Sequence, residues 1–125
     1  MTRDEFDTHC ATLDHATNVV QWGGRSVWKV GGKIFALCTP ETKESGHTKI
    51  SFKCSDMVYE ILRDQPGIVP APHLARAKWV QLSEPDAMSD EDIKQHLDAA
   101  HDIIVGKLTR KICAELGLPY RSNRS

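Results

Sequence analysis

The chain has 125 residues, of which 40% are hydrophobic and 26% are charged, and its formal net charge is −1 at pH 7. This length and composition are typical of one globular domain and exclude a wholly disordered chain. No run of about 18 apolar residues is present, so the sequence predicts no membrane-spanning helix and no membrane partner. The near-zero charge also gives no global basic excess that would indicate nucleic acid.

The N-terminus predicts a short first helix. Thr2 and Glu5 have the spacing of a capping box, and Phe6, Cys10 and Leu13 follow at helical spacing, so we expect this helix to end near Leu13. The N-terminal residues 1–5 are acidic and lack the apolar core of a signal peptide, which predicts a cytoplasmic protein.

The cysteines show no spacing typical of a metal or redox site. Because no secretion signal precedes them, we expect four free thiols at small core positions. They are Cys10, Cys38, Cys54 and Cys113.

The middle of the chain predicts strands. Residues 18–22, 26–30 and 33–38 are rich in strand formers, and Gly-Gly pairs at 23–24 and 31–32 predict two hairpin turns between them. In residues 48–53, Ile50 and Phe52 alternate with Lys49, Ser51 and Lys53. Alternation of this kind predicts a strand with one buried and one solvated face.

The second half predicts two helices and one more strand. Ser55 is a good N-cap for a helix that ends before Pro66-Gly67, and residues 67–72 contain two prolines that exclude regular helix. Residues 76–82 predict a strand. Ser89 caps a long last helix, whose apolar stripe includes Ile93 and Leu108 and which we expect to run to Gly117.

This order of elements predicts the fold class. Mostly antiparallel strands with helices on one face form an α+β two-layer sandwich. We expect one domain over residues 1–117, followed by a flexible tail at 118–125.

The net charge hides an uneven distribution. Residues 1–20 sum to −3, residues 21–81 to +4 and residues 82–125 to −2. The basic strands also contain the three tryptophans, which predicts a sheet face or hairpin edge that contacts phosphates while aromatic rings stack on bases. The alternative is structural: lysines on a solvated face protect a sheet from aggregation, and tryptophan in strands is commonly core.

Several short motifs occur in one order at close spacing. They are Trp22-Gly23-Gly24, the run Lys29 to Ala36, Ser51-Phe52-Lys53, Pro66-Gly67-Ile68 with Pro70-Ala71-Pro72, and Lys78-Trp79-Val80. Together they resemble the MmcQ/YjbR family of small bacterial proteins, and the resemblance covers residues 13–108.

The resemblance implies a CyaY-like α+β fold and DNA binding through a "double-wing" arrangement of strands and loops. Carried over by position, the implied nucleic-acid contacts are Lys29, Lys33, Lys53, Arg76 and Lys78. One departure concerns the last helix, where the family commonly has Ser-Tyr and this chain has Ala100-His101. The charge of −1 predicts that any DNA binding is weak and sensitive to salt.

The sequence offers no constellation for catalysis. No nucleophile elbow, phosphate-binding loop or dinucleotide motif is present, so we expect a protein that is not an enzyme and needs no cofactor. His96 and His101 are five residues apart on one predicted helix and do not converge, so we expect no metal site.

A second class of function stays open. The Pro70-Ala71-Pro72-His73 loop and nearby Trp79 form a mixed apolar and polar surface that would suit a protein or small-ligand partner. An apolar pocket near Trp79 and His101 would favour this alternative. In either case we expect a monomer.

Overall fold

The computed structural model describes residues 1–44 and 46–121, and its strands form one antiparallel sheet in the order β1-β2-β3-β4-β6-β5. The strands are β1 (Ala16–Gln21), β2 (Arg25–Val30), β3 (Lys33–Cys38), β4 (Ile50–Lys53), β5 (Ile68–Pro70) and β6 (Trp79–Leu82). The helices are α1 (Arg3–Cys10), α2 (Asp56–Leu62), α3 (Asp90–Val105), α4 (Arg110–Leu116) and the short 3-10 helix η1 (Ala75–Ala77).

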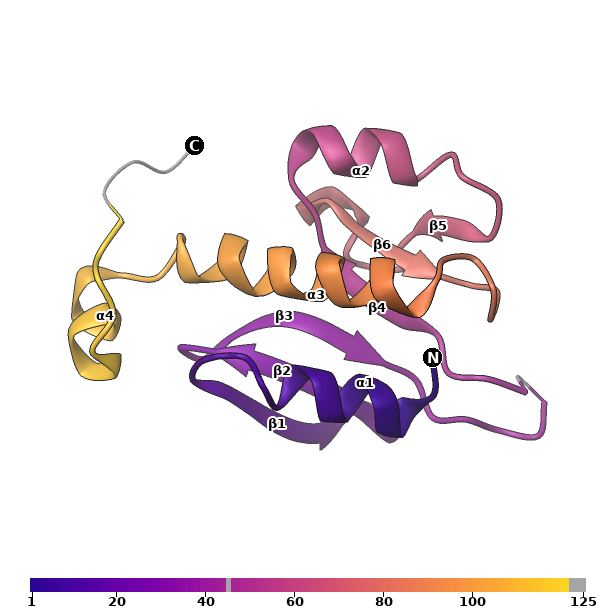
Figure 1. Ribbon diagram of the computed structural model, residues 1–125, viewed down its shortest axis with the longest axis horizontal. Coiled ribbons are helices and arrows are strands. Elements are labelled where there is room, and N and C mark those ends of the chain that lie inside the picture. The colour runs from indigo at the N-terminus through magenta and orange to yellow at the C-terminus, as the bar shows by residue number, and fades with distance from the viewer. Residues whose placement is uncertain (45, 122–125) are drawn as a thin grey trace.

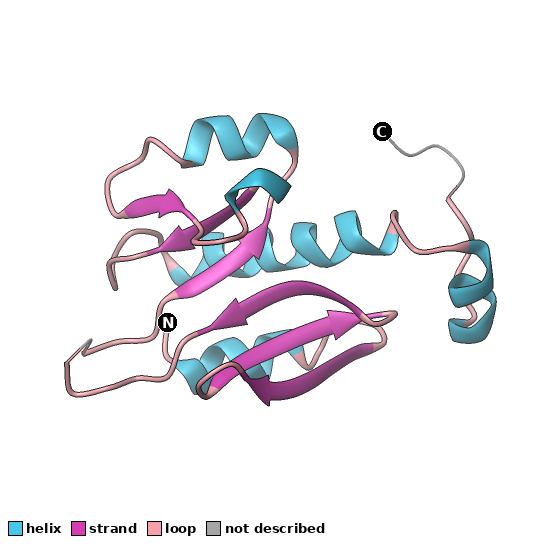
Figure 2. Ribbon diagram, turned by 180° about the vertical axis from the view of Figure 1, so that it is seen from behind, coloured by secondary structure: helices cyan, strands magenta, loops and turns pink. Residues whose placement is uncertain are grey.

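Helices α1 and α3 cover one face of this sheet (Figure 1). Seen from behind, the strands lie in front of α3 (Figure 2). The molecule is therefore an α+β two-layer sandwich, which confirms the predicted fold class. None of the helices within residues 1–44 and 46–121 combines the length and the apolar character that crossing a membrane requires.

Local signals in the sequence determine where most elements begin. The capping box of Thr2 and Glu5 is present at α1. The hydroxyls of Ser55 and Ser89 accept hydrogen bonds from the third backbone amide of α2 and of α3, respectively. Both Gly-Gly pairs form hairpin turns with positive φ. These predictions are confirmed, although α1 ends at Cys10 and not near Leu13.

The prediction of one long last helix is wrong. Helix α3 ends at Val105, because Gly106 weakens the helix and the Thr109 hydroxyl accepts the amide of Ile112 to begin α4. Residues 118–121, at the start of the predicted tail, contact the domain: Leu118 and Tyr120 pack against the core, and Arg121 pairs with Asp102 at 2.7 Å. Residues 122–125 of that tail lie outside the described residues.

Two strand predictions also need correction. Residues 75–77 form η1, so β6 begins at Trp79 and not at Arg76. Strand β4 has the predicted alternation but not the predicted solvated face, because Ser51 and Lys53 are only 2% and 9% exposed. Both faces of β4 are therefore covered by other parts of the chain.

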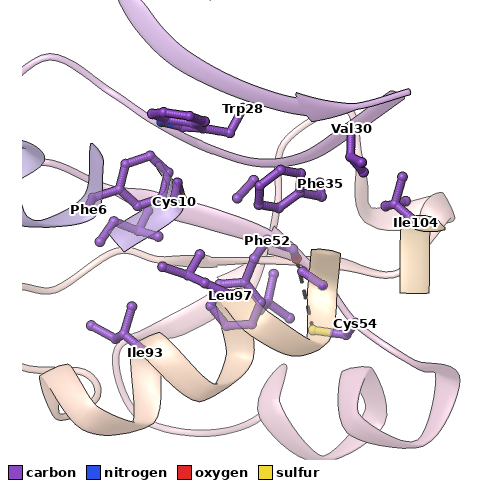
Figure 3. Close-up of a cluster of buried hydrophobic side chains, with 14 of the residues drawn as sticks. Phe6, Cys10, Trp28, Val30, Phe35, Phe52, Cys54, Ile93, Leu97 and Ile104 are labelled. Atoms are coloured by element: carbon purple, nitrogen blue, oxygen red, sulfur yellow. Dashed lines mark hydrogen bonds between the residues drawn. The ribbon is translucent and has the colours of Figure 1, made fainter. Parts of the chain in front are cut away.

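The main core lies between the sheet and helices α1 and α3. Phe6 and Cys10 of α1 meet Phe35 and Phe52 of the strands, and Leu97 of α3 packs between them (Figure 3). A β-bulge in β3 opposite Trp28 and Lys29 places the consecutive residues Phe35 and Ala36 both in this core.

Asp7 ties α1 to the sheet through a small polar network. One of its carboxylate oxygens accepts hydrogen bonds from the Ser26 hydroxyl at 2.6 Å and the Trp28 indole at 2.9 Å. Ser26 in turn accepts from the Asn18 amide at 2.8 Å. These bonds satisfy polar groups that α1 would otherwise bury against the sheet.

The four cysteines are free and buried, as predicted. Burial raises the pKa of Cys38 and of Cys54 to about 11, and it also raises the pKa of Cys10. Thiols in such an environment stay protonated at neutral pH and act as small core side chains.

Gly31 is required by a close approach of α4 to the β2–β3 turn. A Cβ at this position would lie 2.6 Å from Leu108, just before α4, and 2.9 Å from Ile112 of α4, whereas one at Gly32 would meet open space. Both glycines have positive φ. We expect Gly32→Ala to lower the free energy of unfolding by about 1 kcal/mol, and Gly31→Ala to lower it by about 2–4 kcal/mol. If urea denaturation gives the same loss of unfolding free energy for both variants, the packing of α4 on this turn is contradicted.

His96 gives the fold a pH dependence. Its ring stacks on Phe52 at a centroid distance of 5.2 Å, and burial lowers its pKa below the ordinary value of 6.5. The unfolded chain therefore binds the proton more readily, and stability decreases as pH falls below that value. We expect the loss of melting temperature between about pH 7 and pH 5 to be smaller in His96→Gln than in the wild type. An identical pH profile in both proteins would refute this.

Candidate nucleic-acid interface

A second, smaller apolar cluster lies on the face of the sheet opposite α3. It consists of Val27, Leu37, Ala71 and Trp79, with Ile34 and Leu74 packed against it. Alternation along the strands explains this placement, because the neighbouring Trp28, Ala36 and Val80 all face the main core.

Residues 71–78, here called the 71–78 segment, cover this cluster. Backbone hydrogen bonds close the segment on itself: the Ala71 amide donates to the Trp79 carbonyl at 3.0 Å, and the Trp79 amide donates to the Leu74 carbonyl at 3.3 Å. The ammonium group of Lys53 also donates to the Ala77 carbonyl. The segment is thus fixed to β4 and β6, and it presents Arg76 and Lys78 at a defined place.

A basic groove of about 640 Å³ lies at the end of the sheet beside this segment. Side chains from the start of β3, the end of β4, the 71–78 segment and the turn after α3 converge on it. Its charged lining is Lys33, Lys53, Arg76, Lys78, Lys107 and Asp56. Five cations therefore face one carboxylate among the described residues that line it.

These cations differ in how far they are available to a ligand. Lys33, Arg76 and Lys107 are exposed. Lys78 is half-buried, with its ammonium 5.1 Å from the centre of the Tyr59 ring. Burial, followed by the nearby charge of Lys107, lowers the pKa of Lys53. Lys53 therefore acts mainly as the anchor of the 71–78 segment.

The groove brings together four of the five predicted contacts but not the fifth. Lys29 pairs with Ile34 across β2 and β3, and it lies on the strand next to the groove without lining it. The site also differs in position from the predicted one, which was a face of the sheet or a hairpin edge. Arg76 lies on η1, Lys78 caps η1 with φ of 65°, and Lys33 begins β3, so the cations gather at the end of the sheet.

A second concavity, here called the hollow, lies over the face opposite α3. It has a volume of about 440 Å³, and its floor includes Leu37 and Leu74. Trp22, Arg25, Ser51, His73 and Gln81 supply its aromatic and polar lining. Of the predicted partner surface, Ala71, Pro72 and His73 contribute directly to this hollow.

Trp79 and His101, which were also predicted for the partner surface, lie elsewhere. Trp79 is 4% exposed and belongs to the small cluster beneath the 71–78 segment. His101 lies on α3, where its Nε2–H donates to the Asp14 carbonyl at 2.7 Å and its ring meets Phe35 edge-on. The sheet separates these two side chains, so they do not form the joint pocket that would have favoured a ligand.

Sequence reasoning missed Lys107 in the groove and four residues of the hollow, Trp22, Arg25, Ser51 and Gln81. One local signal was available in the sequence, because Trp22 directly precedes Gly23-Gly24 and is one of the three tryptophans predicted to stack on bases. In the structure it is 55% exposed, with φ of 52°. Positive φ is uncommon for a bulky residue and draws attention to the turn. Within the described residues, no group of three histidine, cysteine or acidic side chains is placed to hold a metal ion.

Comparison with known proteins identifies the family. The family model YjbR matches residues 11–103, from the end of α1 almost to the end of α3. The chain belongs to the YjbR family. This confirms the resemblance found in the sequence. The match includes the 71–78 segment and the groove residues other than Ile104 and Lys107.

Two solved structures resemble this YjbR protein. Deinococcus radiodurans protein DR2400, described as having a DUF419 domain, is 26% identical with a TM-score of 0.78 over 98% of this chain and 92% of its own. A Pseudomonas syringae protein is 19% identical with a TM-score of 0.64, over 82% of this chain and 98% of its own. The second likeness concerns the fold alone. No curated protein matches the chain.

Proposed function

We propose that this YjbR protein binds the phosphate backbone of DNA through the basic groove. The observation that carries the proposal is the convergence of Lys33, Arg76, Lys78 and Lys107, which are far apart in the sequence, around one concave surface. Lysine and arginine supply most phosphate contacts in nucleic-acid complexes.

The charge distribution supports a weak and salt-sensitive interaction. The whole chain carries a net charge of −1, so attraction at long range is small. Close to the groove the balance is strongly positive, because Asp56 is the one acid among the described lining residues. A small set of phosphate contacts on a nearly neutral protein gives modest affinity that falls steeply as salt rises.

The residues of the groove have different roles in this proposal. Lys33, Arg76 and Lys107 are exposed and contact phosphates directly, while Lys78 contributes from a half-buried position. Lys53 holds the segment in place through Ala77. The role is binding and not catalysis, since the described lining offers ammonium and guanidinium groups without a histidine, serine or cysteine.

Charge reversal in the groove is the main test. We expect Arg76→Glu to weaken binding of a labelled duplex at least about tenfold in fluorescence anisotropy, and to reduce the slope of log K against log salt by about 1. Lys43→Glu is the matched control, because it makes the same charge change in the loop between β3 and β4. If the two variants weaken binding equally, the effect comes from the overall charge of the protein and the groove is not the binding site. Absence of duplex binding at low salt would also refute the proposal.

Lys78→Gly separates binding from folding. Lys78 has φ of 65°, a conformation that glycine adopts without strain, and this relief offsets the lost contact with the Tyr59 ring and the added freedom of the unfolded chain. The replacement should therefore change the free energy of unfolding by no more than about 1 kcal/mol. We expect the same variant to weaken duplex binding and lower the salt slope. A stable Lys78→Gly protein that binds as tightly as the wild type would exclude Lys78 from the interface.

A further inference from the structure

One row of side chains crosses the whole face of the sheet opposite α3, from β1 to β5. Strand register places Val19, Val27, Leu37, Ser51, Gln81 and Val69 side by side on the six described strands. Four of these residues are apolar. The two polar ones are neighbours, and both line the hollow.

Ser51 and Gln81 interrupt this apolar row with polar side chains at two adjacent positions. Ser51 is only 2% exposed, between Leu37 and Gln81. Among the described residues, neither side chain makes a hydrogen bond to a protein group. Gln81 is half-buried, and among the described residues no buried side-chain nitrogen or oxygen lacks a partner. The polar atoms of Ser51 and Gln81 are therefore accessible from the hollow that both residues line, where a ligand can hydrogen-bond with them.

The chemistry of the lining restricts what that ligand is. The Gln81 amide and the Ser51 hydroxyl each offer a donor and an acceptor, which suits a ring edge that alternates N–H and C=O groups. Trp22 stands at the rim, 55% exposed, and offers an aromatic face for stacking. Arg25 beside it offers a guanidinium for an anion. The described lining contains no carboxylate to oppose that charge.

The backbone conformation of two lining residues fixes the edge of the hollow. Trp22 and His73 both have positive φ, at 52° and 65°, and the Arg25 guanidinium donates to the Trp22 carbonyl at 2.5 Å. Strained backbone of this kind persists when its surroundings fix it. Here it keeps Trp22 at the rim of the hollow.

We propose that the hollow binds a nucleotide, with the base stacked on Trp22, its edge hydrogen-bonded to Ser51 and Gln81, and its phosphate on Arg25. The volume of about 440 Å³ is within the range of small-ligand sites. The nucleotide is either free or part of a single strand. A strand could contact both sites, because the hollow and the basic groove are adjacent and Leu74 lines both. Binding of a free nucleotide does not depend on the groove.

Fluorescence and NMR titrations of the full chain test this proposal. Trp28 and Trp79 are 7% and 4% exposed, so stacking in the hollow should change mainly the emission of Trp22. The probes are the four nucleoside 5′-monophosphates, ribose 5-phosphate as the anion without a base, and a short single-stranded oligonucleotide. We expect at least one base-bearing probe to quench Trp22 and to shift the side-chain amide signals of Gln81, and ribose 5-phosphate to do neither.

Variants locate the binding. Gln81→Met keeps the shape of the side chain and removes its polar edge, and Ser51→Ala is a smaller second change; each should weaken base-dependent binding at least about tenfold. Arg76→Glu is the control in the groove, and it should leave mononucleotide binding unchanged while weakening the oligonucleotide. Thermal melting of each variant confirms that it is folded.

The outcomes distinguish this proposal from that of the groove. Binding of mononucleotides that depends on Gln81 supports a free nucleotide as the ligand. Binding of the oligonucleotide alone, weakened by Gln81→Met, supports a base within a single strand. If no base-bearing probe binds, if ribose 5-phosphate binds equally well, or if folded Gln81→Met and Ser51→Ala proteins bind as the wild type does, the hollow is not a nucleotide site. Duplex binding that depends on Arg76 would still stand in that case.

Discussion

Burial of the central strands on both faces is the constraint on which the rest of the structure depends. Strands β3 and β4 place Phe35 and Phe52 against the helices, and on the other face they place Leu37 and Ser51, which are also buried. A sheet with two buried faces needs a second covering layer. In this protein the 71–78 segment supplies that layer over part of the sheet, with Trp79 packed beneath it.

The position of this cover determines both candidate sites. Its backbone bonds to Trp79 and the contact from Lys53 to Ala77 hold it across β4 and β6. One side of the segment therefore borders the end of the sheet, where Arg76 and Lys78 meet the groove, and the other side borders the hollow through His73. Leu74 lies between the two sites and lines both. A change that loosens the segment would disturb the groove and the hollow together.

Local sequence signals predicted most of the fold and only part of the site. Capping residues such as Thr2 and Ser89, and the paired glycines of the hairpins, act within a few residues, so the sequence displays them directly. The separation of α3 from α4 was missed because Gly106 lies inside an otherwise continuous apolar stripe. The hollow could not be predicted, since Ser51 and Gln81 become neighbours only through the register of β4 and β6. Alternation assigned Ser51 to a solvated face, and nothing local showed that the 71–78 segment would enclose it in a hollow.

The bulge in β3 explains why the cations gather at the end of the sheet and not on its face. Strict alternation from Ala36 would direct Lys33 to the same side as Lys29. Because Phe35 and Ala36 both enter the main core, Ile34 moves to the opposite face and pairs with Lys29, while Lys33 pairs with Val30 on the side of α3. Lys33 thus reaches the groove lined by Lys107, beyond the end of α3. One extra residue in a strand separates two lysines that flank the same glycine turn, and it directs one of them toward the cations that come from distant parts of the chain.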